Sequence, residues 1–359
     1  MSETVPFAHF NSSGPRGPDY GFTIVGLIRM ANSRAFAPVK VGVVGLGRFG
    51  RLHALTLAGL AEAELVGVVA RRQASLDNIQ RELSDVPGWL DLNRALEDSE
   101  AEAWVVACST AEHVSVTRTL LQAGKSVLLE KPVSAVLTEA ESLAPLVGVD
   151  SSNLMLGHIL LFNSEFKQLR DEVVHRGRPT FIDSVRHRPA SIVQDFPGEN
   201  PLQAAMIHDL YAVQVLMQSE EPQRFTAQFH RTEHGAVDLA LAQIEWSDGT
   251  LASFAASYLT PVGMAPRGFD RMEVFGDGWA ARISPNPRPL EVWDEQARWP
   301  MALEIRTDSS GPTGMMAEEL RCFCRVVRGL ERVPIGATYA DALQTQRWMN
   351  RLESAVHSR

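Results

Sequence analysis

The stretch Val39-Lys-Val-Gly-Val-Val-Gly-Leu-Gly-Arg-Phe-Gly50 joins a short apolar, β-branched run directly to a Gly-x-Gly-x-x-Gly loop. The apolar run predicts a buried strand, and the residues after the loop have helical spacing over 48–60. In such a unit, Gly45 permits the tight turn, Gly47 lets the backbone approach a pyrophosphate, and Gly50 permits close helix–strand packing. The helix start also offers unpaired N–H groups to phosphates. We therefore predict that these glycines, with Arg48 and Phe49 between them, bind a dinucleotide.

Beyond the loop, apolar runs alternate with helical stretches as far as about residue 156. The runs are rich in β-branched residues and show no in–out alternation, which is typical of parallel strands buried on both faces. The helices between them would cover both faces of the sheet, and Gly124 is a natural stop for the third helix. The predicted strands are 39–44, 65–70, 104–108 and 126–129, and the predicted helices are 48–60, 74–83 and 112–123.

The second half of the chain has a different pattern. Its apolar residues alternate with polar ones, as in half-exposed antiparallel strands, and Ser247-Asp-Gly249 has the composition of a hairpin turn. The predicted strands are 181–186, 239–246, 250–258 and 271–275, and helices are predicted near 316–328 and 338–355.

These patterns predict an α/β domain followed by an α+β domain. The first, over 38–156, is expected to be a Rossmann domain with a doubly wound parallel sheet. The second, over 157–359, is expected to have a mostly antiparallel open sheet. Residues 1–37 contain Pro, Gly and Ser and are predicted to form a poorly ordered tail.

The composition is that of a globular protein and excludes several classes. Of the 359 residues 45% are hydrophobic, and 34 Lys and Arg against 43 Asp and Glu give a net charge of -9. This charge disfavours nucleic acid and anionic membranes, and no apolar run approaches the ~20 residues of a membrane span. The three cysteines are an odd number, so we expect free thiols and a cytoplasmic location. No His, Cys and Asp set has zinc-site spacing, so no metal is expected.

The end of the second predicted strand bears on the choice of nicotinamide cofactor. A site that prefers NAD places Asp or Glu there, where the carboxylate accepts from the ribose 2′-hydroxyl. Here the sequence reads Ala70-Arg71-Arg72. Two guanidinium groups can pair with the 2′-phosphate of NADP, so we expect NAD(P), with NADP favoured. The alternative is that both arginines point into water.

Three further motifs lie at positions suited to a ligand site. Glu130-Lys131-Pro132 ends a predicted strand at the carboxyl edge of the sheet, where open α/β sheets bind ligands. Ala107-Cys-Ser-Thr-Ala-Glu-His113 follows the preceding strand, and Met206-Ile-His-Asp-Leu-Tyr211 opens a helical stretch in the second domain. With the glycine loop, these motifs resemble those of the glucose–fructose oxidoreductase / inositol dehydrogenase (Gfo/Idh/MocA) family. The resemblance runs from Val39 onward and is closest to UDP-sugar 3-dehydrogenase-like members.

The resemblance implies an NAD(P)-dependent oxidoreductase that transfers hydride between nicotinamide and a secondary alcohol of a sugar, cyclitol or nucleotide sugar. It also implies a homo-oligomer, a dimer or a tetramer, formed through the open sheet, and makes the Lys131–Pro132 bond a candidate for the cis form. Ser109, His113, Glu130 and Lys131 are expected to line the cofactor site. For His113 the alternative is that it only caps the helix that follows.

Two residues are expected to carry the chemistry. Oxidation of a secondary alcohol requires a general base within hydrogen-bond reach of the hydroxyl. Lysine, with a pKa of about 10.4, is a poor base unless burial lowers its pKa, which Glu130 would oppose. Histidine titrates near neutrality. We therefore expect Lys131 to polarise the reacting oxygen and His208 to shuttle its proton. The alternatives are an ordinary strand-end lysine and a helix histidine with a satisfied partner.

The predicted substrate-binding residues are Asn163, Arg186, His208 and Asp209. Arg186 belongs to an Arg-His-Arg-Pro segment that suits the charge of a sugar diphosphate, with a solvated loop as the alternative. For Asn163, a role in the core or at a strand end is equally open.

Two positions depart from the family pattern. Ala204 stands where members usually have an Asp that shares a helix face with the histidine and can orient it, and Leu161 stands where the UDP-sugar members carry Arg. Asp183 or Asp195 could replace the missing acid. The departures leave two other functions open. One is a catalytically silent cofactor-binding regulator or assembly protein, and the other is a glycosidase of the same fold that recycles its bound NAD.

Overall fold

The computed structural model describes residues 37–194, 198–264, 268–286, 292–293, 297–298, 306–308 and 311–356. Of the predicted tail over 1–37, all but Ala37 lies outside these ranges. Pro38–Arg359 forms one compact unit. No helix in the described ranges is long and apolar enough to cross a membrane. The three cysteines are unpaired thiols, as expected.

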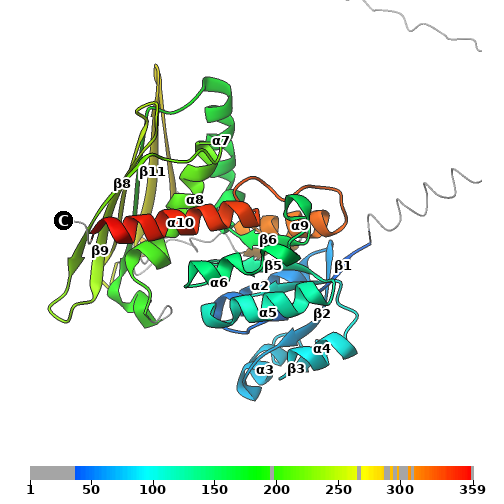
Figure 1. The fold of residues 1–359 in the computed structure, drawn as a ribbon. Helices are drawn as coiled ribbons and strands as arrows, with labels where there is room; N and C mark the ends of the chain where they lie inside the picture. Colours follow the sequence, from blue (N-terminus) through cyan, green and yellow to red (C-terminus); the bar gives the residue numbers. More distant parts are fainter. Residues whose placement is uncertain are drawn as a thin grey trace, which may run out of the picture. The chain divides into compact units, whose positions relative to one another are not determined.

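The first half of the unit is built on a six-stranded sheet in which every strand pair is parallel (Figure 1). Its order, β3-β2-β1-β4-β5-β6, is the doubly wound order in which ligands bind at the carboxyl edge. The strands are β1 (Val39–Val44), β2 (Ala63–Val69), β3 (Gly88–Trp89), β4 (Ala103–Val106), β5 (Ser126–Glu130) and β6 (Leu154–Gly157). The predicted Rossmann sheet is confirmed.

Both faces of this sheet are buried, which explains why its strands lack alternation. Along β4, Ala103 and Val105 pack into the apolar cluster on one face, and Trp104 and Val106 pack into the cluster on the other. Gly124 has a φ of +70° directly after α5, as expected for a helix stop. The helices of this half are α2 (Arg48–Gly59), α3 (Gln73–Gln80), α4 (Leu92–Asp98), α5 (Thr110–Gln122) and α6 (Leu137–Glu141).

The second half contains another six-stranded sheet, in the order β12-β11-β7-β10-β9-β8. Only the central β7–β10 pair is parallel, so the predicted mostly antiparallel sheet is confirmed. Gly249 in the β9–β10 turn has a φ of +85°, as the predicted hairpin requires. The strands are β7 (Phe181–Pro189), β8 (Arg224–Arg231), β9 (Val237–Glu245), β10 (Leu251–Thr260), β11 (Phe269–Gly276) and β12 (Trp279–Asn286).

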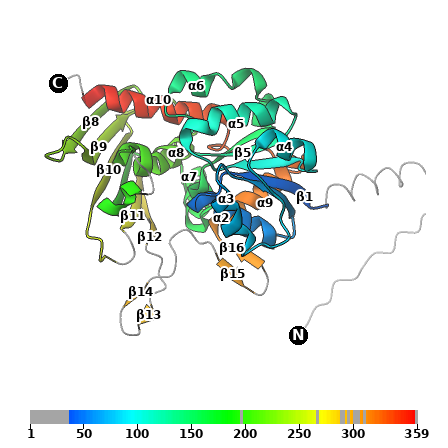
Figure 2. The same cartoon turned by 90° about the horizontal axis from the view of Figure 1, so that it is seen from below.

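Helices lie along one face of this second sheet (Figures 1 and 2). α10 packs on β8, α8 on β7, and α7 on β12. Leu241 of β9, Leu251 of β10 and Phe275 of β11 are exposed. The main helices are α7 (Ser164–Arg176), α8 (Ile207–Leu216), α9 (Met315–Val327) and α10 (Tyr339–Val356).

Several short elements complete the chain. A π-helical turn, η5 (Leu202–Met206), leads directly into α8, and a 3-10 turn, η3 (Ile159–Phe162), leads into α7. The remaining short pieces are η1 (Ala144–Leu146), η2 (Val149–Ser151), η4 (Ala190–Gln194), β13 (Val292–Trp293), β14 (Ala297–Arg298), β15 (Arg306–Asp308) and β16 (Gly311–Thr313).

The last two helices return to the first half of the unit. α9 packs against α2 and η3. Tyr339 and Leu343 of α10 belong to the same apolar cluster as Trp104 and Leu129 of the Rossmann sheet. The chain's final segment therefore completes the core around the first sheet.

A buried polar cluster joins three of these elements. His53 of α2 lies 2.8 Å, Nε2 to Oε1, from Glu130 at the end of β5. Glu319 of α9 lies close to both, with its ligand atom within 4.8 Å of theirs, and its two oxygens have no hydrogen-bond partner within the described ranges. Burial and the neighbouring Glu130 raise the pKa of Glu319 well above 4.5. Burial opposes the charge of Glu130, but the His53 hydrogen bond and nearby positive charge lower its pKa overall. Glu319 is therefore neutral beside an ionised Glu130.

We expect the stability of the Glu319→Gln variant, relative to that of the wild type, to increase as the pH rises. A carboxyl group whose folded-state pKa is raised contributes fully to stability below its unfolded-state pKa, and this contribution is lost as the pH rises toward the folded-state pKa. Glutamine cannot ionise and escapes the loss. From about pH 5 upward, the difference in unfolding free energy should grow by up to about 1.4 kcal/mol per pH unit, as measured by urea unfolding.

The matched control is Glu318→Gln, because Glu318 is the adjacent residue on α9, is partly exposed and pairs with Arg321. The difference in unfolding free energy between Glu318→Gln and the wild type should stay constant with pH. A difference between Glu319→Gln and the wild type that stays constant with pH would contradict a neutral Glu319.

Candidate active site

Two glycines of the loop are required by the packing of the protein itself. Gly45 has a φ of +92°, and a Cβ there would lie 2.5 Å from the backbone of Cys108. A Cβ on Gly50 would lie 1.8 Å from the carbonyl oxygen of Gly45. Both distances are far inside van der Waals contact, so the loop closes against β4 only with glycine at these positions.

Gly47 is different, because nothing in the protein requires it. Its φ is -69°, which any residue adopts, and no heavy atom lies within 4 Å of an added Cβ. It is exposed at the start of α2, next to backbone N–H groups that have no partner within the helix. An open space in front of a helix N-terminus fits the pyrophosphate of a dinucleotide. Of the two residues between Gly47 and Gly50, Arg48 is exposed and Phe49 packs against the core.

Arg71 and Arg72 lie where the sequence places them, directly after β2. Both are exposed, and Arg72 is the residue that precedes α3. Within the described ranges neither forms a salt bridge. The charge of Arg71 acts on the Cys108 thiol, so this guanidinium faces the turn that also carries Ser109. Ser109 is exposed at the start of α5, and its side chain makes no capping hydrogen bond.

The Glu130-Lys131-Pro132 segment is held in place by neighbouring elements. The Lys131–Pro132 bond is cis, as the resemblance suggested. His113 lies inside α5 and does not cap it: its Nδ1 lies 2.7 Å from the carbonyl oxygen of Pro132, and its Nε2 lies 3.3 Å from that of Cys108. Burial lowers the pKa of His113, so the ring is neutral and donates from Nδ1 to Pro132. His113 therefore fixes the course of the chain beside Lys131.

Lys131 has the environment that a proton-transferring lysine requires. Burial lowers its pKa, the negative charges of Glu199 and Glu130 oppose this shift, and Arg186 adds to it. The net direction is downward, which matches the expected effect of burial and the expected opposition of Glu130. Glu199 lies just before η5 and is not singled out by any pattern in the sequence.

His208 lies in the first turn of α8 and is partly exposed. Burial lowers its pKa well below 6.5, followed by the positive charge of Lys131 and then that of Arg186. Lys131 is thus the strongest electrostatic influence on His208. The charge of the strand-end amine therefore acts on the helix imidazole, and the lowered pKa of His208 favours the neutral ring.

The partner of His208 is a phenol and not an acid. The Nδ1 atom of His208 lies 2.8 Å from the hydroxyl of Tyr211, one helical turn later. Of the two acids proposed to replace the missing carboxylate, Asp183 pairs with Arg271 at 2.8 Å, and Asp195 lies outside the described residues. Sequence analysis missed Tyr211, although the spacing of three residues on a predicted helix signals such a contact.

Arg186 and Asp209 form an ion pair with each other. The Nε and Nη2 atoms of Arg186 lie 3.1 and 2.9 Å from the two carboxylate oxygens of Asp209, and Nη1 lies 2.8 Å from Asp270. Arg188 binds the same Asp270. Arg186, Asp209 and Asp270 are all buried. This geometry does not support the predicted anion site at Arg186, because its donors already serve two carboxylates. It fastens α8 to β7 and β11.

Asn163 is fully buried and caps α7, since its Oδ1 accepts from the backbone N–H of Phe166 at 2.8 Å. Its Nδ2 has no partner among the described residues. Leu161 lies in the apolar core. His158 is also buried, at the end of β6, where Nδ1 lies 2.5 Å from the carbonyl oxygen of Gly336. Asn163 thus has the core position that was one of its two expected roles.

The cluster of His53, Glu130 and Glu319 is the group within the described ranges that could hold a metal ion, since one potential ligand atom from each lies within 4.8 Å of the others. The His53–Glu130 separation of 2.8 Å is that of a hydrogen bond. Two ligands of a tetrahedral zinc ion stand about 3.3 Å apart when the bonds are about 2.0 Å. We therefore interpret the His53–Glu130 contact as a hydrogen bond.

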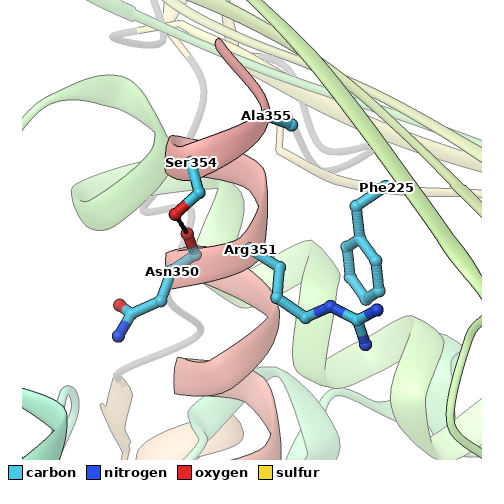
Figure 3. A pocket seen from close by; sticks show the side chains of 5 residues that line it. All are labelled: Phe225, Asn350, Arg351, Ser354 and Ala355. Carbon is cyan, nitrogen blue, oxygen red and sulfur yellow. Dashed lines mark hydrogen bonds between the residues drawn. The ribbon is translucent and has the colours of Figure 1, made fainter. Parts of the chain in front are cut away.

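A surface pocket lies elsewhere, between β8 and α10 (Figure 3). Arg351 extends over the ring of Phe225, with 4.2 Å between the guanidinium carbon and the ring centroid. The pocket shares no residue with the glycine loop, Lys131 or His208. The candidate active site is therefore defined by its chemistry and not by this pocket.

Comparisons with known proteins agree with this geometry. A model described as an oxidoreductase family with an NAD-binding Rossmann fold matches residues 39–158, and a model of the GFO/IDH/MocA C-terminal domain matches residues 153–281. A myo-inositol 2-dehydrogenase of Thermotoga maritima is 26% identical over 248 residues, which are 66% of this chain and 73% of the relative. A UDP-N-acetylglucosamine 3-dehydrogenase of Acidithiobacillus ferrooxidans is 27% identical over 222 residues, 61% of this chain and 67% of the relative.

Solved structures show the same fold. The scyllo-inositol dehydrogenase of Lactobacillus casei, in a crystal with bound NAD(H) and scyllo-inositol, superposes with a TM-score of 0.75 at 20% identity, covering 89% of this chain and 97% of that one. The glycine loop, the Lys131 strand end and both domain models thus lead to one assignment: the chain belongs to the GFO/IDH/MocA family of oxidoreductases with an NAD-binding Rossmann fold.

Proposed function

We propose that this chain is an NAD(P)-dependent oxidoreductase that acts on a secondary alcohol of a sugar, cyclitol or nucleotide sugar. One observation carries the proposal: the amine of Lys131, which follows β5 at the carboxyl edge of the Rossmann sheet, has a lowered pKa and acts electrostatically on the His208 imidazole, whose pKa is also lowered. This edge is where the glycine loop offers room for a dinucleotide. The bound nicotinamide would supply the hydride acceptor or donor.

The residues fit this cofactor. Gly47 and the N-terminus of α2 would receive the pyrophosphate, and Ser109 is exposed at the neighbouring strand end. His113 would act through Pro132, by holding the chain that carries Lys131. Glu130 would act through its contact with His53 and its charge beside the lysine.

Lys131 and His208 are the proposed catalytic residues, and we propose that both contact the reacting oxygen. A cationic amine would stabilise the developing alkoxide, and a neutral amine could accept its proton. The lowered pKa of Lys131 makes the neutral form accessible. Which of the two groups takes the proton depends on which ring nitrogen of His208 carries the hydrogen.

Within this substrate class we favour an uncharged polyol over a sugar diphosphate. A diphosphate needs a cationic subsite, and the charges of Arg186 and Arg188 are already balanced by Asp209 and Asp270. Leu161, at the position where UDP-sugar members carry Arg, is buried in the core. Two of the similar enzymes, the inositol dehydrogenases of Thermotoga maritima and Lactobacillus casei, are named for cyclitols.

The remaining parts of the proposal concern cofactor choice and assembly. Two exposed arginines after β2 favour NADP. The exposed apolar residues Leu241, Leu251 and Phe275 support a homo-oligomer joined through the second sheet. Unpaired thiols support a cytoplasmic location.

The activity test uses the full chain with NADP or NAD and a panel of inositols, free sugars and UDP-sugars. We expect reduction of the cofactor, read as the absorbance of the reduced nicotinamide, with at least one polyol. Lys131→Met and His208→Gln should each lower kcat/KM by about 100-fold or more, because each removes a group that contacts the reacting oxygen.

The matched controls are Lys167→Met and His175→Gln, on α7, whose rates should stay near that of the wild type. Near wild-type rates in both Lys131→Met and His208→Gln would contradict the assignment. Binding of cofactor without turnover across the whole panel would favour the regulator, and net glycoside hydrolysis without net cofactor reduction would favour the glycosidase.

A second experiment tests the cofactor preference. Replacing both Arg71 and Arg72 by Ala should raise the KM for NADP by about tenfold or more and leave the KM for NAD nearly unchanged, because only NADP has a 2′-phosphate. Arg81→Ala, at the other end of α3, is the control. Equal effects of the double substitution on both cofactors would overturn the preference.

A further inference from the structure

We propose that Tyr211 holds the hydrogen of His208 on Nε2, so that His208 acts as a hydrogen-bond donor to the reacting oxygen and Lys131 accepts its proton. The tautomer follows from contacts within this chain. Only its consequence for the reaction rests on the function proposed above.

The hydrogen bonds of Tyr211 fix the direction of its hydroxyl. The side chain is completely buried. Its oxygen accepts from the backbone N–H of Leu160 at 3.1 Å, and the Nδ1 atom of His208 lies 2.8 Å away. Within the described ranges, Nδ1 of His208 is the one acceptor that the structure gives to the O–H hydrogen. Because a buried hydroxyl without an acceptor is costly, the O–H points to Nδ1.

The protonation of both partners agrees with this direction. Burial raises the pKa of Tyr211, so the phenol keeps its hydrogen. Burial keeps the imidazole neutral, and the positive charges of Arg186 and Arg188 add to this effect. A neutral imidazole that accepts at Nδ1 must carry its single hydrogen on Nε2.

The Tyr211 ring cannot turn its hydroxyl away from His208, because a second aromatic ring packs against the face of the Tyr211 ring. His158 stacks on it with 4.1 Å between ring centroids and 6° between planes. Burial lowers the pKa of His158 to about 4, so this ring is neutral and donates from Nδ1 to the carbonyl oxygen of Gly336. Gly336 itself has no room for a side chain, since a Cβ would lie 2.2 Å from Val215.

A tyrosine hydroxyl and a carboxylate that contact Nδ1 favour opposite tautomers of the histidine. A carboxylate on Nδ1 can only accept, so it holds the hydrogen on Nδ1 and leaves Nε2 ready to take a proton. Here Ala204 provides no carboxylate and Tyr211 donates. The Nε2 atom already carries a hydrogen and cannot receive the hydroxyl proton. When the O–H bond of the alcohol breaks, the proton passes to the lone pair on Nζ of neutral Lys131, which becomes an ammonium group.

The test reads the tautomer directly by nuclear magnetic resonance. In protein labelled with ¹⁵N-histidine, the His208 ring signals are assigned by their loss in His208→Gln. We expect a pyridine-type shift for Nδ1 and a pyrrole-type shift for Nε2. In Tyr211→Phe the donor to Nδ1 is gone, so both shifts should move toward the average of the two tautomers. This measurement needs neither substrate nor cofactor.

The matched control is Tyr339→Phe, which removes another buried hydroxyl, bonded to the carbonyl oxygen of Ala140. It should leave the His208 signals unchanged. A wild-type Nδ1 of pyrrole type would overturn the proposal, as would identical His208 signals in wild type and Tyr211→Phe. Where the panel reveals a substrate, Tyr211→Phe should lower kcat by about tenfold with little change in KM. If no substrate is found, the proposed function fails while the tautomer result still decides this inference.

Discussion

The hydrogen bond between His53 and Glu130 fixes the strand end from which Lys131 extends. Glu130 ends a strand buried on both faces, and its side chain is held from α2 by His53 and approached from α9 by Glu319. Gly157 of β6 lies against it, since a Cβ there would be 3.2 Å from Glu130. With this carboxylate held by separate elements, the next residue, Lys131, leaves the sheet in one direction. His113 holds the far side of the turn.

A second constraint places the histidine. Arg186 of β7 binds Asp209 through two donors and Asp270 through a third, all in the interior. Buried ion pairs of this kind lose hydration and depend on their hydrogen bonds, and here each carboxylate oxygen of Asp209 and Asp270 accepts at least one. Burial opposes the charge of Arg186, but Asp209 and Asp270 raise its pKa overall, so it stays cationic. Since Asp209 adjoins His208, the network that fastens α8 also fixes the backbone that carries His208.

Both constraints affect the protonation of His208. Burial and then positive charges from both halves of the unit lower the pKa of one imidazole, that of His208. The absence of an acid at Ala204 is therefore compatible with catalysis. A phenol that stays protonated supplies the missing hydrogen bond, and it does so as a donor.

The sequence predicted most of the secondary structure, because buried strands and amphipathic helices leave local patterns. The exceptions have physical causes. β8 and β12 are the edge strands of their sheet, and their exposed, charged residues weaken the apolar signal. Strand β3 has two residues, too few for any periodicity. Helix α7 was also missed, although Phe166, Leu169 and Val173 form a buried helical stripe.

For the site, the sequence by itself determined the residue types that can do chemistry and the edge at which they gather. Gly45, Gly47, Gly50 and Lys131 are marked by local motifs, because a tight turn and a strand end are local features. The partners of these residues are not local: His53 meets Glu319, and Arg186 meets Asp270, only when distant segments pack together. Only the tertiary structure could decide that the charge of Arg186 is balanced by two carboxylates, that Glu319 is protonated and that His208 contacts Tyr211. Burial and hydrogen-bond direction set those states, and both are properties of the folded chain.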